Sequence, residues 1–322
     1  MRKSVYTFIL LFAFNFGFSQ IVDIPDAEFK NVLLNYNPVI DTNNDGEIQV
    51  SEAEAVLELN FYGPEFLSVS SLEGLDSFVN LSLFWLQETN IDDVVLENFS
   101  NLEDIKIADF NIASITLVNL PNLKYLRFRN NLGPVFNLDM SSCNCIELES
   151  LAYVTIPHLT DFDISSYVNL KYLQLKEVPI SQIDLTNQIN LEEIRIADVD
   201  ISELDFSNQP GLNLIQLANL SISSLNLELH NNLEWLSLTQ VTCDYLNVKN
   251  GHIPNVLGLN YSNINFVCAD ESEIDSIEIF QLNINTNIGS VSSYCTFTPG
   301  GEYFTIQGTN RVDINTNGCD MN

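Results

Sequence analysis

Positive charge is scarce in this chain of 322 residues, which carries 12 Lys and Arg against 43 Asp and Glu and has a formal net charge of −31. Such a surface repels nucleic acids and anionic membranes and attracts divalent cations. Hydrophobic residues still make up 46% of the chain, which is too many for a disordered acidic tail. The composition therefore predicts a folded protein that binds no nucleic acid.

Catalytic signatures are also missing. The three histidines, His158, His230 and His252, have no spacing typical of a metal site or a catalytic triad. The sequence contains no G-x-S-x-G, H-E-x-x-H or phosphate-binding loop. Paired carboxylates are frequent, but in so acidic a chain their pairing carries no information. We therefore expect that the protein is not an enzyme.

Long apolar runs are absent beyond the N-terminus, so no later segment is expected to span a membrane. The N-terminus itself has basic Arg2 and Lys3, an apolar run from Val5 to Phe18, and small residues at Gly17 and Ser19. This pattern predicts a signal peptide over residues 1–19, and so a secreted or cell-surface protein. A membrane anchor is the alternative, but the run is short for a span. A lipoprotein is not favoured, since no cysteine lies near the cleavage site.

Six cysteines follow the signal peptide, and export permits disulfides among them. Cys243 and Cys268 lie about one repeat apart and form a possible pair between stacked neighbours. Cys295 with Cys319 is a weaker alternative. Cys143 and Cys145 are too close in sequence for an easy mutual disulfide. A metal site at these two cysteines is less favoured, because no Cys or His cluster lies near them.

The dominant pattern is a repeat of two apolar triplets, seen clearly in Leu191/Ile194/Ile196 and Ile201/Leu204/Phe206. Most repeats are 21 residues apart, with exceptions of 25, 22 and 23. The repeats begin at Leu81, Leu102, Leu123, Leu148, Leu170, Leu191, Leu212, Leu233 and, weakly, Val256. This period is typical of a leucine-rich-repeat solenoid, in which each unit buries its triplets against its neighbours.

We therefore predict a mainly β leucine-rich-repeat solenoid of eight to nine repeats of about 21 residues, with a small helical EF-hand-like N-terminal cap. The second triplet predicts a second extended segment in each repeat, with little α-helix. The usual turn asparagine survives only at Asn131, so apolar packing is expected to hold the turns. The expected domains are a signal peptide (1–19), a helix–calcium loop–helix cap (20–60), the solenoid (61–268), and a connector with a truncated β-rich segment (269–322).

The segment from Asp41 to Glu52 matches the EF-hand loop pattern D-x-[DN]-x-[DN]-G-x5-E. Asp26 is expected to cap a helix before the loop, and residues 51–55 to begin a helix after it. The loop predicts a calcium site of modest affinity with a structural role, although an acidic turn without metal is the alternative. The expected ligands are Asp41, Asn43, Asp45, the backbone carbonyl of Glu47, Gln49 and the bidentate carboxylate of Glu52.

The scarce cations gather with aromatic residues in the columns expected to face outward from the first strand of each repeat. Such a set predicts a binding face for an extracellular protein or a glycan. The candidate residues are Trp85, Lys106, Tyr125, Arg127, Arg129, Tyr172, Gln174, Arg195 and Trp235. A purely structural role is the alternative. Glu103, Lys124, Glu149, Lys171 and Glu192 alternate in sign from repeat to repeat, as expected for a salt-bridge ladder.

Beyond Asp270 the period is lost, with a possible short helix and then a strand-rich tail that contains an incomplete calcium-like loop from Asp313. The order of IPDAEFKNVLLN, DTNNDGEIQVSEAEA, the repeats, FVCADESEID and SYCTFTPGGEYFTIQGTNRVDINTNGCD resembles secreted leucine-rich-repeat proteins of Bacteroidota, of the flavobacterial type. The resemblance implies surface binding or adhesion, with no catalytic residue. Its members often continue into β-domains and a type IX secretion sorting domain, so we expect a truncated chain or a short member.

These observations lead to two hypotheses of function. The first is an exported binding and adhesion module that is stabilised by calcium and recognises a protein or glycan through the concave sheet. The second is a structural spacer in a larger cell-surface adhesin, with no ligand on the repeats.

Overall fold

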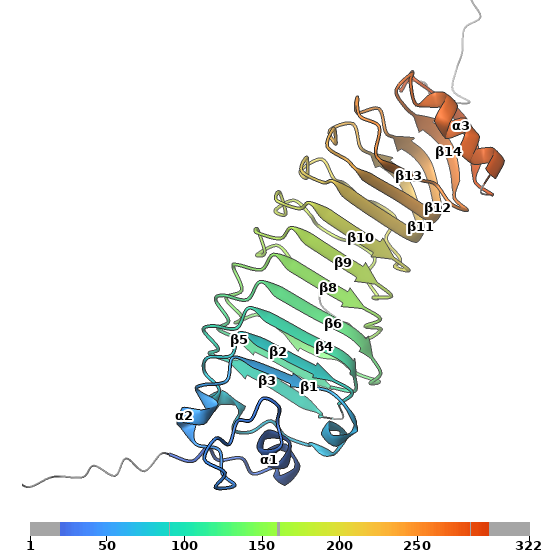
Figure 1. The fold of residues 1–322 in the computed structure, drawn as a ribbon. Helices are drawn as coiled ribbons and strands as arrows, with labels where there is room; N and C mark the ends of the chain where they lie inside the picture. The colour runs from blue at the N-terminus through green and yellow to red at the C-terminus, as the bar shows by residue number, and fades with distance from the viewer. Residues whose placement is uncertain (1–19, 90, 160–161, 284, 296–322) are drawn as a thin grey trace, which may run out of the picture.

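The computed structural model describes residues 20–89, 91–159, 162–283 and 285–295. The predicted signal peptide, Cys319 and the calcium-like loop from Asp313 lie outside the described residues. The chain forms an elongated solenoid in which successive turns stack one on the next (Figure 1). Within the described residues, no helix is long and apolar enough to cross a membrane.

A long parallel sheet forms one wall of the solenoid. Each repeat contributes one strand to it, because the alternating triplet turns its leucines into the core and the residues between them toward solvent. Eleven strands follow one another in the order β1-β2-β4-β6-β8-β9-β10-β11-β12-β14-β15, and the short β13 pairs with β12. We call this the main sheet. Its strands are β1 (Glu58–Phe61), β2 (Leu83–Gln87), β4 (Asp104–Phe110), β6 (Tyr125–Asn131), β8 (Ser150–Val154), β9 (Tyr172–Lys176), β10 (Glu193–Ala197), β11 (Leu214–Asn226), β12 (Trp235–Asn247), β13 (Val256–Gly258), β14 (Asn263–Cys268) and β15 (Asn287–Ser292).

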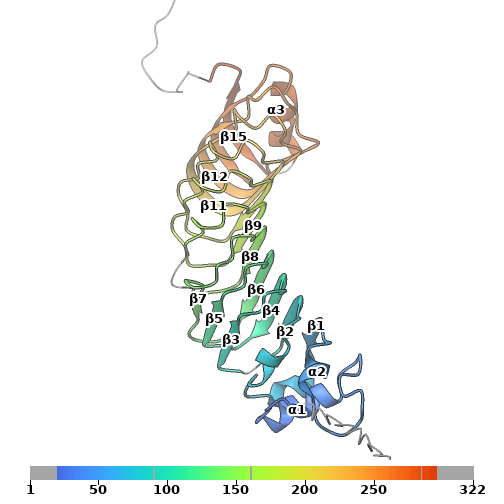
Figure 2. The ribbon, with the colours of Figure 1, turned by 90° about the vertical axis from the view of Figure 1, so that its left-hand side faces the viewer.

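The opposite wall is less regular. β3 (Asp93–Glu97), β5 (Ser114–Val118) and β7 (Asn137–Asp139) form a three-stranded parallel sheet. Figure 2 shows this sheet across the stack from the main sheet. Farther along, the 13-residue strands β11 and β12 extend from the main sheet into the second triplet. The predicted second extended segment is therefore a paired strand in only some of the repeats.

The core runs the length of the stack between the two walls. Both triplets of the repeat that begins at Leu191 are buried, with Leu191 and Ile194 fully inaccessible and Phe206 1% exposed. The residues at the position of the usual turn asparagine are buried too, from Thr89 at 2% exposed to Val241 at 0%. Apolar packing of these turns, expected from the loss of the usual asparagine, is confirmed.

The ladder is longer than the sequence predicted. We expected the solenoid to span residues 61–268, with a first strand at Leu57 and Leu59 leading in; β1 lies there, at Glu58–Phe61, and β15 lies beyond residue 268. Asn287–Ser292 pairs in parallel with β14, from Asn263–Asn287 to Cys268–Ser292. The periodic leucines that mark earlier repeats are missing from this last turn, as expected from the loss of the period beyond Asp270, although the parallel pairing continues. The predicted short helix is present as α3 (Ile274–Asn283) between these two strands.

The N-terminal cap contains α1 (Ala27–Leu34), α2 (Val50–Ala53) and two 3-10 helices, η1 (Pro64–Ser68) and η2 (Leu75–Ser77). Asp26 caps α1 as predicted, because its Oδ1 accepts hydrogen bonds from the backbone N–H groups of Glu28 and Phe29, both at 2.9 Å. Phe29 and Leu33 are the buried residues of α1. The predicted helix after the acidic loop is a single turn.

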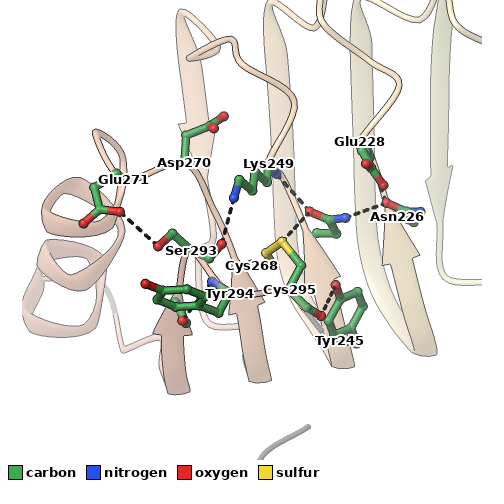
Figure 3. The surroundings of a disulfide bond; sticks show 12 residues. Asn226, Glu228, Tyr245, Lys249, Cys268, Asp270, Glu271, Ser293, Tyr294 and Cys295 are labelled. Atoms are coloured by element: carbon green, nitrogen blue, oxygen red, sulfur yellow. Dashed lines mark hydrogen bonds between the residues drawn. A yellow bond between two sulfur atoms is a disulfide. The ribbon is translucent and has the colours of Figure 1, made fainter. Parts of the chain in front are cut away.

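The cysteine pairing differs from the prediction. Cys268 is bonded to Cys295, and Cys243 is a free, buried cysteine, so the predicted pair of Cys243 with Cys268 is wrong (Figure 3). The last turn of the solenoid, which the sequence did not reveal, brings Cys295 to a Cα–Cα distance of 5.2 Å from Cys268. Cys143 and Cys145 are also bonded, with Cα atoms 5.2 Å apart across a turn, against our expectation.

Candidate calcium loop and binding face

The acidic loop of the cap is folded by its own side chains. Asp41 accepts hydrogen bonds from the backbone N–H groups of Asp45 at 3.3 Å and Gly46 at 3.0 Å. Asn43 accepts from the N–H of Asp45, and Asp45 accepts from the N–H of Glu47 at 2.9 Å. Gly46 has a φ of +80°, which the sharp turn requires. The first, third and fifth positions of the predicted loop thus face the turn that they close.

Glu52 holds the two ends of the loop together. One carboxylate oxygen accepts from the N–H of Thr42 at 2.8 Å and from its hydroxyl at 2.7 Å, and the other accepts from the N–H of Gln49 at 3.0 Å. Burial would raise the pKa of Glu52, but the hydrogen bonds from Gln49, Thr42 and Asn43 outweigh it, and the pKa is lowered. Its carboxylate is therefore ionised and occupied by protein donors.

The remaining predicted ligands surround Asp45. The amide nitrogen of Asn43 donates to Asp45 Oδ2 at 3.0 Å, and that of Gln49 donates to both Asp45 oxygens at 3.1 and 3.0 Å. The Glu47 side chain instead forms an ion pair with Lys30. Among the described residues, no three His, Cys, Asp or Glu side chains are grouped to hold a metal.

The exposed face of the main sheet is organised in columns that run across the strands. The central column joins Trp85, Lys106, Arg127, Ala152, Gln174, Arg195, Gln216 and Ser237 in register. The column on its N-terminal side contains Leu83, Asp104, Tyr125, Ser150, Tyr172, Glu193, Leu214 and Trp235. Arg129 lies in the column on the other side, between Ala108 and Val154.

Most cations on this face have acidic partners. Asp104 pairs with Lys106 at 2.9 Å and with Arg127 at 3.1 Å, while Arg195 lies 3.5 Å from Glu193. The Lys106 ammonium lies 6.0 Å from the Trp85 ring and the Arg195 guanidinium 5.8 Å from the Tyr172 ring. The face is therefore a mixture of charges and rings. Sequence reasoning missed the two acids, although Asp104-x-Lys106 and Glu193-x-Arg195 place both members of each pair on one face of a strand.

Arg129 differs from these cations. It is exposed, and no ion pair joins it to any residue in the described part of the chain. Its register neighbours, Ala108 and Val154, carry no charge. An unpaired guanidinium beside small side chains is open to an acceptor from a partner.

The register brings together most of the predicted binding residues and separates one. The candidates of the central column lie on strands from β2 to β10. Tyr125 and Tyr172 lie in the neighbouring column, with Ser150 between them. Trp235, which is 43% exposed, lies farther along, beyond Glu193 and Leu214. Five of the candidates lie on two strands that only β8 separates: Tyr125, Arg127 and Arg129 on β6, and Tyr172 and Gln174 on β9.

The column just before the strands forms the predicted salt-bridge ladder. Lys124 lies 3.1 Å from Glu103, and Lys171 lies 3.1 Å from Glu149. The four side chains are between 32% and 48% exposed. Exposed ion pairs of this kind contribute about 0–1 kcal/mol to the free energy of unfolding. Two pairs of the predicted ladder are therefore formed, which agrees with the structural interpretation of this column.

No protein-family model matches the chain, and no curated protein matches it. Among solved structures, an internalin (inlF) of Listeria monocytogenes is 18% identical, covers 82% of this chain and 91% of its own, and has a TM-score of 0.45. Internalin C2 of the same organism is 16% identical over 83% of this chain and 93% of its own, with a TM-score of 0.45. A leucine-rich-repeat protein of Leptospira interrogans is 14% identical over 84% of this chain and 96% of its own, with a TM-score of 0.34. These scores are too low to support an argument about function. The chain's own period and strand register define it as a mainly β leucine-rich-repeat solenoid.

Proposed function

We propose that the protein is an exported binding and adhesion module that recognises an extracellular protein or a glycan through the exposed face of the main sheet. The observation that carries this proposal is the register that aligns Trp85, Lys106, Arg127, Gln174 and Arg195 in one column beside two tyrosines. A rigid sheet holds these side chains at fixed spacing, which lowers the entropy lost on binding.

The charge pattern favours a polar, uncharged or mixed-charge ligand over a polyanion. Asp104 and Glu193 form ion pairs with three of the cations and offset two of their three positive charges, so the face presents donors and acceptors between aromatic rings. Aromatic rings with neighbouring hydrogen-bonding groups suit sugar rings and polar protein surfaces. Arg129 supplies one unmatched donor group for an acidic substituent.

The test replaces Tyr125 and Tyr172 by Ser and Arg127 and Arg129 by Ala in one variant, and measures binding to glycan and extracellular-protein arrays. Loss of the ligands bound by the unmodified protein supports the proposal. The matched control changes Val95 and Thr116 to Ala on the opposite wall, where the side chains also face outward from strands. Equal binding by both variants would instead support the spacer hypothesis, in which the repeats carry no ligand.

We also propose that the acidic loop binds calcium through Asp41, Asn43 and Asp45, with the Glu47 carbonyl, Gln49 and Glu52 completing the set. Support comes from the matching loop pattern and from side chains that face a tight turn. When bound, the ion would neutralise clustered carboxylates and lock the cap. Affinities of extracellular loops of this kind fall at about 10⁻⁴–10⁻³ M.

The calcium proposal is tested by thermal melting at millimolar calcium and in chelator. We expect a higher melting temperature with calcium, and loss of this difference in Asp41→Ala. Asp205→Ala, which changes an acidic turn far from the cap, serves as the control. An identical melting temperature in calcium and in chelator would contradict the proposal.

A further inference from the structure

The wall opposite the main sheet contains a cavity where its three-stranded sheet ends. β7 is the last strand of that sheet, and it lies about halfway along the stack (Figure 2). The longer repeat that begins at Leu123 contributes Leu138–Ser141, and a cavity of about 420 Å³ lies between this segment and Phe162–Tyr167. A cavity of this size is within the range that holds a small molecule.

The floor of the cavity is aromatic and carries a poorly satisfied hydroxyl. Tyr153 replaces the aliphatic residue that ends the first triplet in most repeats and is only 4% exposed. Its ring stacks on Phe128 at 5.6 Å and meets Phe162 edge-on at 6.2 Å. Within the described residues, the only hydrogen-bond partner of its hydroxyl is the Met140 thioether at 3.6 Å, which is a weak acceptor.

A second phenol converges on the same sulfur. The Tyr167 hydroxyl lies 3.8 Å from Met140 Sδ, and Tyr167 is 8% exposed. Burial raises the pKa of Tyr153 well above its usual value, with a further contribution from Tyr167, so the phenol stays protonated. Buried tyrosine hydroxyls usually have a good hydrogen-bond partner. Tyr167 also interacts with the Ser166 side chain, whereas the Tyr153 hydroxyl has only the weak thioether acceptor. The Tyr153 hydroxyl therefore leaves hydrogen-bonding capacity for a molecule in the cavity.

The mouth of the cavity is acidic. Asp139 and Asp163 line it, and both are exposed. Asp139 accepts a hydrogen bond from the N–H of Ser141 at 2.9 Å, and Asp163 accepts one from Ser165 at 2.8 Å. These contacts lower the pKa of each carboxyl group, so both are ionised at neutral pH. Among the described residues that line the cavity there is no lysine or arginine.

We propose that this cavity binds a small aromatic amine. The ring lies against Tyr153 and Phe162, a polar atom at the far end of the ring bonds the Tyr153 and Tyr167 hydroxyls, and the ammonium group meets Asp139 and Asp163 at the mouth. This site is separate from the binding face proposed on the main sheet, and it lies on the other wall of the solenoid.

Isothermal titration calorimetry with three probes tests the proposal. Tyramine has the ring, the polar end and the ammonium group. Phenethylamine lacks the polar end, and 3-(4-hydroxyphenyl)propionate replaces the ammonium by a carboxylate. We expect saturable binding of tyramine, about tenfold weaker binding of phenethylamine, and at least about tenfold weaker binding of the propionate, because each lost charge-assisted or buried hydrogen bond costs about one order of magnitude.

Two variants assign the binding to this cavity. Asp139→Asn with Asp163→Asn keeps the turn acceptors but removes the charge, and should weaken tyramine about tenfold or more. Asp93→Asn with Asp205→Asn is the matched control, because both carboxylates are exposed and accept hydrogen bonds, from Ser114 at 2.6 Å and from Ser207 at 2.9 Å, and neither lines the cavity. Tyr153→Phe should reduce the preference for tyramine over phenethylamine while the protein remains folded, because only the Tyr167 hydroxyl then remains to bond the polar end.

Three results would overturn the proposal. The first is the absence of saturable tyramine binding at millimolar concentration. The second is equal affinity for tyramine and the propionate, which would exclude recognition of the ammonium group. The third is an equal effect of the two double variants, which would mean that the general negative charge of the protein attracts the amine.

Discussion

At the scale of single residues, Asp26 connects the cap to the first turn of the solenoid. Its Oδ1 caps α1, and its Oδ2 accepts from the N–H of Ser70 at 2.8 Å, from the Ser70 hydroxyl at 2.7 Å and from the N–H of Ser71 at 3.0 Å. Burial would raise the pKa of Asp26, but the hydrogen bonds from Ser70, Phe29 and Ser71 together lower it. One carboxylate thus joins segments about 44 residues apart in sequence.

We predict that Asp26→Ala lowers the free energy of unfolding at pH 7 by about 1–2 kcal/mol, the usual range for losing a helix N-cap. Because the pKa is lower in the folded state, this contribution is complete above the unfolded pKa of about 3.9 and disappears as the pH falls through the folded pKa. Urea unfolding at pH 7 and at about pH 2.5 measures both effects. The difference between the variant and the unmodified protein should shrink in acid.

Glu28→Ala is the control for Asp26, because Glu28 lies in the same helical turn but is exposed. It should change the free energy of unfolding by less than about 0.5 kcal/mol. A destabilisation by Asp26→Ala that stays constant between the two pH values would contradict the assigned role of its charge.

Residue patterns predicted the core better than the turns. The L-x-x-L-x-L triplets determine which side chains are buried, because a strand alternates its two faces. A second column, which follows the first triplet of the repeats and lies inside β4, β6, β11 and β12, escaped prediction. Its members have a φ between 49° and 57° in one turn after another, namely Glu88, Asp109, Asn130, Thr155, Glu177, Asp198, Asn219, Gln240, Tyr261 and Asn285. Asn and Asp favour this conformation, but Thr, Glu, Gln and Tyr do not. The residue types at these positions therefore did not predict the positive φ.

At the scale of elements, β1 is the first strand of the main sheet and has a neighbour on one side only. An open strand edge invites pairing with another chain. Tyr36, just after α1, covers this edge, since its hydroxyl accepts a hydrogen bond from the N–H of Asn60 at 2.6 Å and donates to the carbonyl of Glu58 at 3.5 Å. Its hydroxyl therefore takes the place that the backbone of another strand would occupy.

We predict that Tyr36→Phe lowers the free energy of unfolding by about 0.5–1.5 kcal/mol, the usual contribution of a hydrogen bond, and speeds amide exchange at Asn60. Denaturant unfolding and hydrogen exchange measure the two effects. Tyr62→Phe is the control, because Tyr62 is 58% exposed and lies outside this contact. Equal stability and unchanged exchange at Asn60 in Tyr36→Phe would show that the edge does not depend on the hydroxyl.

The cysteines show why the elements at the ends were harder to predict than those in the middle. Cys243 occupies an inward column that aliphatic residues fill in other repeats, and there it behaves as a small apolar side chain. Burial raises the pKa of its thiol to about 11, so it is a poor nucleophile. Its sequence separation from Cys268 suggested a bridge between stacked turns, but the true partner, Cys295, lies beyond a turn that has no leucine period.

At the scale of the whole molecule, the protein is a one-dimensional stack in which each turn contacts mainly its neighbours. Such a stack can unfold locally from an end without loss of the rest. The C-terminal end is secured by several contacts besides the disulfide (Figure 3). Tyr245 donates to the carbonyl of Cys295 at 3.2 Å, and the Lys249 ammonium donates to the carbonyl of Ser293 at 2.8 Å.

We predict that replacing Cys268 and Cys295 by Ser in one variant loosens the last turn selectively. A disulfide that closes a loop of this kind contributes about 2–4 kcal/mol by restricting the unfolded chain. Hydrogen exchange measured by mass spectrometry should therefore accelerate over β15 and α3. The acceleration should be smaller over β14, and the exchange rate should be unchanged from β2 to β10. Replacing Cys143 and Cys145 by Ser is the control, and should leave β15 unaffected. Uniform acceleration along the entire stack would instead mean that the solenoid unfolds as one cooperative unit, because only strong coupling between all turns transmits the loss of an end contact to the middle.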